Sequence, residues 1–186
     1  LGKNAPPDLR ETFFLGPLDD HQNYFKSSPG ASSAYAPNIF PQKPIGFACA
    51  LQDIYKHYQR LSEDILRIFA VALDLEENFF SKQIKKHFSI LSSHHYPALC
   101  SHPAPGQLRT GAHTDFGAIT ILAMTQASGG LEVLMADDTW RPVTPRDNEL
   151  VVNLGDMMAL WTNGMWKSAL HRVVNPTELH DKSSDR

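Results

Sequence analysis

Apolar residues recur at helical spacing between Leu51 and Ala72, and polar or charged residues occupy the positions between them. The apolar positions of this stretch are Leu51, Ile54, Tyr55, Tyr58, Leu61, Ile65, Phe69 and Ala72. A stripe with this period predicts an amphipathic helix of about six turns. Asp74 and Glu77 are then spaced like a capping box, which predicts a second, short helix through Ile84. We expect both helices to buttress a sheet.

After His87 the apolar pattern shortens towards a period of two, and turn residues become frequent. This pattern predicts six strands, at residues 88–96, 118–124, 131–135, 150–153, 158–161 and 169–174. Turn sequences rich in glycine, asparagine or aspartate separate them, among them PAPGQ, SGG, ADDT and TNG. Short strands at this spacing favour an antiparallel sandwich or small barrel over a parallel sheet alternating with helices.

A chain of 186 residues with 42% hydrophobic residues is long enough for one domain with its own core. We expect residues 1–46 to be an irregular leader, because they contain more than half of the 13 prolines. In this interpretation residues 47–86 are the helical buttress and residues 87–186 are the β core. The predicted fold class is mainly β with flanking helices.

The charge pattern narrows the range of partners. The formal net charge is -3 and both signs are interspersed, so no basic face is available to neutralise phosphates, and we expect neither nucleic acid nor a membrane as a partner. The chain contains no apolar run of about 18 residues and no signal-peptide core, which predicts a soluble, cytoplasmic protein. Cys49 and Cys100 stand in no CxxC pattern and are expected to be reduced. The sequence does not indicate the oligomeric state.

The candidate chemistry lies in the segment TGAHTDFGAITILAM, residues 110–124. In a strand, residues i and i+2 face the same side, so His113 and Asp115 can converge on one ion. A second histidine from a distant strand would complete a face of three ligands and leave the other face open. His171 in SALHRVVNP is the candidate, although a lone histidine between apolar residues is also typical of a hydrogen-bonded core residue.

Five segments together resemble the Fe(II)- and 2-oxoglutarate-dependent dioxygenase family, in the branch that includes isopenicillin N synthase. They are GAHTDFGAITILAM, GGLEVL, WRPV, LVVNLGDMMALWTNG and SALHRVVNP, in this order. The resemblance extends from about Leu9 to the last residue and implies a double-stranded β-helix, or jelly roll. It also implies that His113, Asp115 and His171 are the metal ligands.

The resemblance further implies which residues hold the co-substrate. Arg186 matches the arginine of the family's RxS motif, which binds the far carboxylate of 2-oxoglutarate, and a guanidinium suits that geometry. Tyr96 in HHYP matches a tyrosine that lines the same pocket, with simple packing as the alternative. Arg172 is the competing arginine, but next to His171 in a strand it should point to the opposite face. Arg109 and Arg141 lie in expected turn regions and are further candidates for binding an anion. His94 and His95 do not fit the ligand pattern, and Asn153, Asp156 and Asn163 are interpreted as residues that fix tight turns.

The implied activity is oxidation, by default hydroxylation, of a C–H bond in a small organic molecule. The implied cofactors are Fe(II), 2-oxoglutarate as co-substrate and O2, and the implied by-products are succinate and CO2. The first alternative is an Fe(II) oxidase that does not use 2-oxoglutarate, like isopenicillin N synthase or aminocyclopropane-carboxylate oxidase. The others are a non-catalytic jelly-roll binding module and a zinc hydrolase. Compared with the family pattern, both ends are missing, so we expect the chain to be a fragment.

Overall fold

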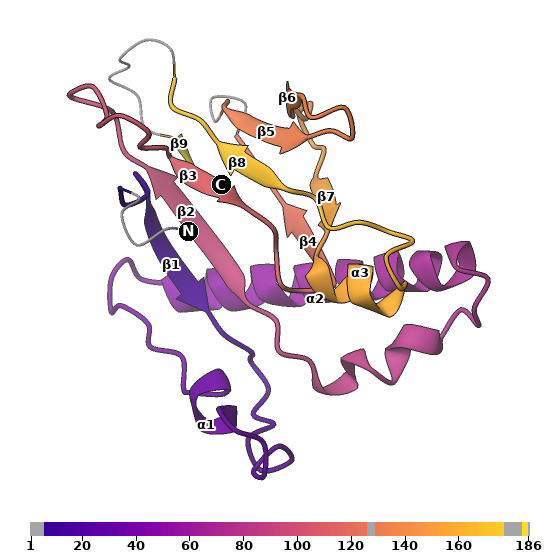
Figure 1. The fold of residues 1–186 in the computed structure, drawn as a ribbon. Helices are drawn as coiled ribbons and strands as arrows, with labels where there is room; N and C mark the ends of the chain where they lie inside the picture. Colours follow the sequence, from indigo (N-terminus) through magenta and orange to yellow (C-terminus); the bar gives the residue numbers. More distant parts are fainter. Residues whose placement is uncertain (1–5, 126–128, 177–183, 186) are drawn as a thin grey trace. The chain divides into compact units, whose positions relative to one another are not determined.

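A computed structural model of the chain describes residues 6–125, 129–176 and 184–185 (Figure 1). The chain divides into two compact units. One unit combines the N-terminal part up to Phe13 with the residues from Ser93 onward, and the other spans Phe14–Ser92. The prediction of a single domain with internal boundaries at residues 46 and 86 stays a prediction.

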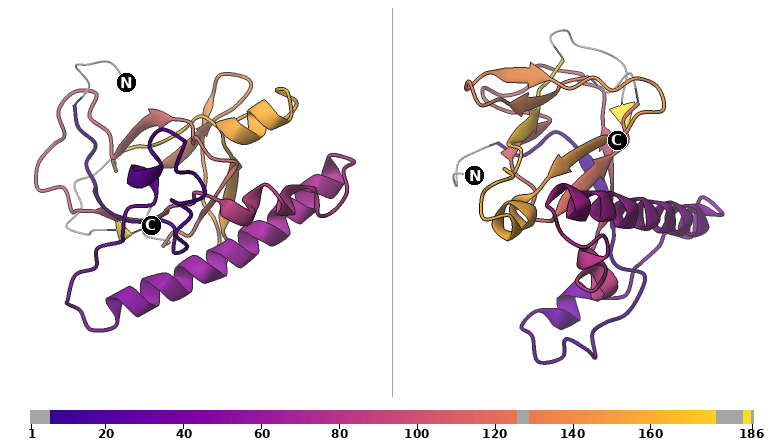
Figure 2. Two further views of the ribbon diagram at one scale, coloured as in Figure 1. Left: turned by 90° about the horizontal axis from the view of Figure 1, so that it is seen from below. Right: turned by 90° about the vertical axis from the view of Figure 1, so that its right-hand side faces the viewer.

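The longest element is α2, Phe47–Ala72, which runs as one continuous helix of 26 residues (Figure 2). Its buried residues, Tyr55, Leu66 and Ala70, lie on one stripe, as the apolar period requires. The predicted helix is therefore confirmed, although it begins four residues before Leu51.

The predicted capping box after α2 is wrong. Asp74 has a φ of 58°, and the N–H of Leu75 donates to the carbonyl of Ala70 at 2.9 Å, so Asp74 ends α2 in the left-handed conformation typical of a helix C-terminus. Glu77 forms an ion pair with Arg67. Two single turns of 3-10 helix follow in place of one α-helix, η1 at Phe79–Ser81 and η2 at Ile84–Lys86.

The described part of the leader, residues 6–46, is mostly irregular but contains two short elements that the sequence pattern did not predict, β1 at Glu11–Leu15 and α1 at Ala31–Ala34. Tyr35 at the end of α1 donates its hydroxyl to the carbonyl of His87 at 3.3 Å. This bond ties the leader to the segment after η2. Within the part of the chain that the structure describes, no helix is both long enough and apolar enough to cross a membrane.

The remaining strands are antiparallel wherever their register is defined. Their bounds are β2 Leu91–Tyr96, β3 Thr110–His113, β4 Ile119–Leu122, β5 Leu131–Leu134, β6 Trp140–Pro142, β7 Val151–Leu154, β8 His171–Val173 and β9 Ser184–Asp185. Together with β1, and within the residues that the structure describes, they form three sheets, with the orders β1-β2-β9, β3-β8-β5-β6 and β4-β7. The chain passes from the second of these sheets to the third in the turn between β3 and β4 (Figure 1).

The core of this β unit lies around Tyr96, Leu131 and Val173, which are at most 5% exposed. Three partly buried residues pack against it: Leu122, Met124 and Val143. These residues come from β2, β4, β5, β8 and the segments that follow β4 and β6, so the core joins strands of all three sheets.

The predicted strand at Met158–Trp161 is wrong, because these residues belong to the helix α3, Asp156–Trp161. Met158 is fully buried while Leu160 is 78% exposed, which is incompatible with two residues on the same face of a strand. A four-residue apolar run is too short to distinguish the two periods. The strands β3, β6 and β9 are not among the six strands predicted from the sequence pattern, although strand geometry was assumed for His113 and Asp115.

In the β3-β8-β5-β6 sheet, Arg172 forms an ion pair with its cross-strand partner Glu132. The Nε and Nη2 atoms of Arg172 lie 2.8 and 2.7 Å from Oε2 of Glu132, and the guanidinium lies 4.0 Å from the ring centre of Trp140. Arg172 is thus used in a structural contact, as its position next to His171 in one strand predicts.

Because this pair is partly buried and stacked on an indole, we expect Arg172→Ala to lower the free energy of unfolding by about 1–2 kcal/mol. Denaturant unfolding of the full-length protein measures the change. Arg141→Ala is the matched control, since Arg141 also pairs with an aspartate, Asp137, but both side chains are more than half exposed. We expect that control to change stability by less than about 0.5 kcal/mol. Equal losses in both variants would contradict the assigned contact.

Candidate metal centre

His113 and His171 face each other as cross-strand partners in the β3-β8 pair. Their ring centres lie 4.3 Å apart. In each ring, Nδ1 lies 2.8 Å from the backbone carbonyl two residues earlier, that of Gly111 or that of Ala169. A carbonyl only accepts hydrogen bonds, so Nδ1 carries the proton in both rings, and in the neutral ring Nε2 is then the nitrogen with the free lone pair. Both histidines are therefore held in the tautomer that a metal ligand requires.

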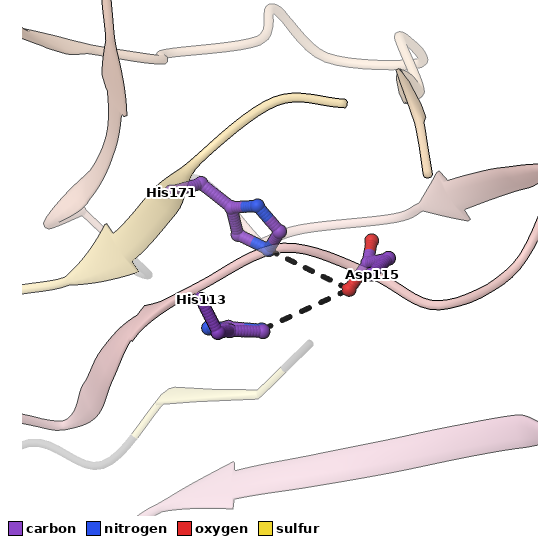
Figure 3. Close-up of side chains that lie close together, drawn as sticks. All are labelled: His113, Asp115 and His171. Atoms are coloured by element: carbon purple, nitrogen blue, oxygen red, sulfur yellow. Dashed lines mark ion pairs between the residues drawn. The ribbon is translucent and has the colours of Figure 1, made fainter. Parts of the chain in front are cut away.

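Asp115 lies in the turn that follows β3, and its Oδ1 atom is 3.8 Å from Nε2 of His113 and 3.8 Å from Nε2 of His171 (Figure 3). The three ligand atoms all lie within 4.8 Å of one another. The prediction that His113 and Asp115 lie in a single strand is wrong, because β3 ends at His113. The turn itself brings the carboxylate back towards the two rings.

The other carboxylate oxygen of Asp115 accepts two hydrogen bonds. The hydroxyl of Thr120 donates to Oδ2 at 2.6 Å, and the amide of Asn153 donates to the same atom at 2.8 Å. Burial alone raises the pKa of Asp115, but the bonds from Asn153 and Thr120 and the nearness of both histidines lower it below its usual value. Asp115 is therefore ionised near neutral pH.

The turn that carries Asp115 is fixed to the N-terminus of α3. The N–H of Asp156 donates to the carbonyl of Asp115 at 2.7 Å, and the N–H of Met157 donates to the carbonyls of Phe116 and Gly117 at 3.3 and 3.2 Å. The first N–H groups of a helix have no partner inside the helix, so the turn supplies their acceptors. The Asp156 side chain accepts a hydrogen bond from the Thr114 hydroxyl at 3.1 Å, which also holds the turn.

The contacts of Thr120 and Asn153 with Asp115 were not predicted from the sequence. Asn153 was interpreted as a turn residue, but it lies inside β7, directly opposite Thr120 in β4. A signal was present, since each is a polar residue inside an otherwise apolar strand segment, AITIL or LVVNL. A buried polar side chain needs a partner, and here the partner is the carboxylate. Asn163, with a φ of 51°, does lie in a turn.

Of the two predicted co-substrate residues, Tyr96 and Arg186, the structure describes only Tyr96. Tyr96 is 3% exposed, and its hydroxyl lies 3.3 Å from Oγ1 of Thr110, the first residue of β3. Arg186 lies outside the described residues, so its proposed role remains a prediction from the resemblance.

Arg109, considered as an alternative anion site, is buried and donates to the carbonyls of Pro97 and Leu9 at 2.5 and 3.4 Å. Burial lowers the pKa of this guanidinium. Its contacts are those of a residue that joins backbone segments. His94 lies in β2 with Nδ1 2.9 Å from Oγ1 of Thr12, and neither His94 nor His95 belongs to the triad.

The donor set suits a redox metal with open coordination positions. Two imidazole nitrogens and one carboxylate oxygen on one face are typical of non-haem Fe(II) oxygenases, whereas thiolate-rich tetrahedral sets are typical of structural zinc. The carboxylate accepts two hydrogen bonds from the protein, and each imidazole ring donates one to a backbone carbonyl, which fixes the orientation of all three metal-binding groups. The residues therefore fit Fe(II) chemically.

Comparison with known proteins identifies relatives that are named as dioxygenases or hydroxylases. The sequence profile of the 2OG-Fe(II) oxygenase superfamily matches residues 87–184. Validamycin A dioxygenase from Streptomyces hygroscopicus subsp. limoneus is 34% identical over 180 residues, covering 95% of this chain and 48% of that protein. Proline hydroxylase buaE from Petromyces alliaceus is 35% identical over 188 residues, covering 96% of this chain and 54% of that protein. The chain thus spans about half the length of these curated relatives.

Among solved structures, a full-length protein from Neurospora crassa in complex with alpha-KG is similar to this chain with a TM-score of 0.82 and 32% identity. The similarity covers 97% of this chain and 54% of that one. The predicted fold class, mainly β with flanking helices and a jelly-roll core, is confirmed by this likeness and by the antiparallel sheets. Since the superfamily profile matches more than half of the residues, the chain belongs to the 2OG-Fe(II) oxygenase superfamily.

Proposed function

We propose that this chain is the metal-binding part of an Fe(II)- and 2-oxoglutarate-dependent oxygenase, with His113, Asp115 and His171 as the ligands. The observation that carries the proposal is the convergence of two imidazole Nε2 atoms and one carboxylate Oδ1 within 4.8 Å. When bound there, Fe(II) supplies, with 2-oxoglutarate and O2, the oxidising power to hydroxylate a C–H bond, releasing succinate and CO2.

The protein residues have separate tasks in this proposal. The carbonyls of Gly111 and Ala169 keep the protons of both histidines on Nδ1 and away from the metal. Asp115 supplies the negative charge that a divalent ion needs. We assign binding of the 2-oxoglutarate carboxylate to Arg186 and Tyr96, on the strength of the family resemblance described above.

We propose a small organic molecule as the substrate. The relatives named above are a dioxygenase of validamycin A and a hydroxylase of proline, and the Neurospora crassa protein was also solved with thymine. These likenesses support a small-molecule substrate and do not single one out. The cytoplasmic location inferred from the sequence stays a prediction.

An anaerobic titration of the full-length protein with Fe(II) and then 2-oxoglutarate tests the proposal. We expect a visible charge-transfer band to form only when both are present, and succinate to form when O2 is admitted with substrate. If Fe(II) binds but no band forms, the oxidase that does not use 2-oxoglutarate replaces the proposed function. If Fe(II) does not bind, the non-catalytic binding module replaces it.

A further inference from the structure

Two cross-strand pairs surround the carboxylate of Asp115. His113 and His171 are opposed in the β3-β8 pair, and Thr120 and Asn153 are opposed in the β4-β7 pair. Asp115 lies in the turn that connects β3, a strand of the β3-β8-β5-β6 sheet, with β4, a strand of the β4-β7 sheet. Each pair faces a different oxygen of the same carboxylate.

The two oxygens are in different environments. Oδ2 lies 2.6 Å from the Thr120 hydroxyl and 2.8 Å from the Asn153 amide nitrogen, so both lone-pair directions of this atom are used by the protein. Oδ1 faces both Nε2 atoms at 3.8 Å. The carboxylate thus offers one oxygen to the candidate metal centre, while the other is held by the β4-β7 pair.

We propose that Thr120 and Asn153 are positioning residues that restrict Asp115 to coordination through Oδ1 alone. The inference rests on the proposed function, because it concerns Fe(II) at the triad. A free carboxylate can bind a metal through one oxygen or both. Coordination through one oxygen would leave more of the metal's coordination positions open for 2-oxoglutarate and O2 than coordination through both.

The cross-strand arrangement explains why both donors are needed. Thr120 is β-branched, so its hydroxyl has few rotamers, and its strand partner Asn153 approaches Oδ2 from the neighbouring strand. Removing one donor leaves the other, but the carboxylate can then rotate about its remaining bond. We therefore expect a partial effect from each single variant and a larger one from the double variant.

The test uses Thr120→Val and Asn153→Leu in the full-length protein, with the 2-oxoglutarate dissociation constant measured at saturating Fe(II) without O2. Valine keeps the shape of threonine and removes only the hydroxyl. At this saturating Fe(II) concentration we expect each variant to hold the metal but to bind 2-oxoglutarate about 10-fold to 100-fold more weakly, the range typical of residues that orient a ligand. Thr120→Ser, which keeps the hydroxyl, should bind 2-oxoglutarate like the unmodified protein. The visible spectrum of Co(II), bound in place of Fe(II), depends on the number of ligands around the metal. This spectrum should therefore change in Thr120→Val and not in Thr120→Ser.

Thr139→Val is the matched control, because Thr139 also donates its hydroxyl to a carboxylate, that of Asp137, in the exposed turn between β5 and β6. Its 2-oxoglutarate dissociation constant should equal that of the unmodified protein. Unchanged constants in both Thr120→Val and Asn153→Leu would overturn the proposal, even if their thermal stability or Fe(II) affinity had fallen. An unmodified protein that binds no Fe(II) or no 2-oxoglutarate would instead overturn the proposed function itself.

Discussion

Replacing His113, Asp115 or His171 by alanine is expected to lower Fe(II) affinity by more than about 100-fold and to remove turnover. Loss of a residue that only orients a ligand typically lowers metal affinity or activity about 10-fold to 100-fold, so loss of the ligand itself should lower them more. Each residue supplies one of the three converging atoms, and no other group of three potential ligands was found within the described ranges. Anaerobic Fe(II) titration and succinate formation measure the two effects.

His57→Ala is the control for the loss of a histidine. His57 is exposed on α2, and its Nδ1 contacts the carbonyl of Asp53, so it has the same kind of backbone bond as His113 and His171. His57→Ala should leave Fe(II) binding unchanged, and so should His94→Ala. Fe(II) affinity retained in two or more of the triad variants would exclude these residues as the ligands.

The sequence predicted the long helix well, because many consecutive turns repeat the same apolar stripe from Leu51 to Ala72. It failed where the elements are short. The helix α3 was predicted as a strand because its apolar run of four residues fits both periods. Only the structure separates them, since Met158 is buried and Leu160 is exposed. The strand β3 was missed because the segment TGAH contains only one aliphatic residue.

The three candidate ligands could be named from the sequence, but the reason they converge could not. The residue pattern gave the pair His113 and Asp115 from strand geometry, whereas the structure uses a turn fixed to the N-terminus of α3. That arrangement depends on hydrogen bonds between residues about 40 positions apart, such as Asp115 with Asn153. No local period records such bonds, and they become visible only when the strands are paired.

The attachment of this turn makes Gly155→Ala the second substitution with a large expected effect. Gly155 precedes α3, and its N–H donates to the carbonyl of Ala118 at 3.0 Å. A Cβ on Gly155 would lie 2.7 Å from the carbonyl oxygen of Asp115 and closer still to that of Gly117. The backbone of Gly155 is extended, with φ -104° and ψ -179°, so alanine meets no conformational penalty there and the effect is purely steric.

Because the atoms in the way are backbone atoms, the turn must move and carry Asp115 with it. A displacement of about 1 Å at a reacting centre can lower the reaction rate about 100-fold. We therefore expect Fe(II) affinity or turnover to fall by about that factor in Gly155→Ala. The free energy of unfolding should also fall by about 1–3 kcal/mol. Anaerobic Fe(II) titration of the folded full-length protein measures the first effect, and denaturant unfolding measures the second.

Gly129→Ala is the matched control for Gly155→Ala, since a Cβ on Gly129 would have no atom within 4 Å and its φ lies outside the positive range. It should keep both Fe(II) affinity and stability. If Gly155→Ala loses stability but binds Fe(II) like the unmodified protein, the turn can yield without moving the carboxylate. In that case the attachment to α3 supports the fold and does not determine the position of the metal ligand.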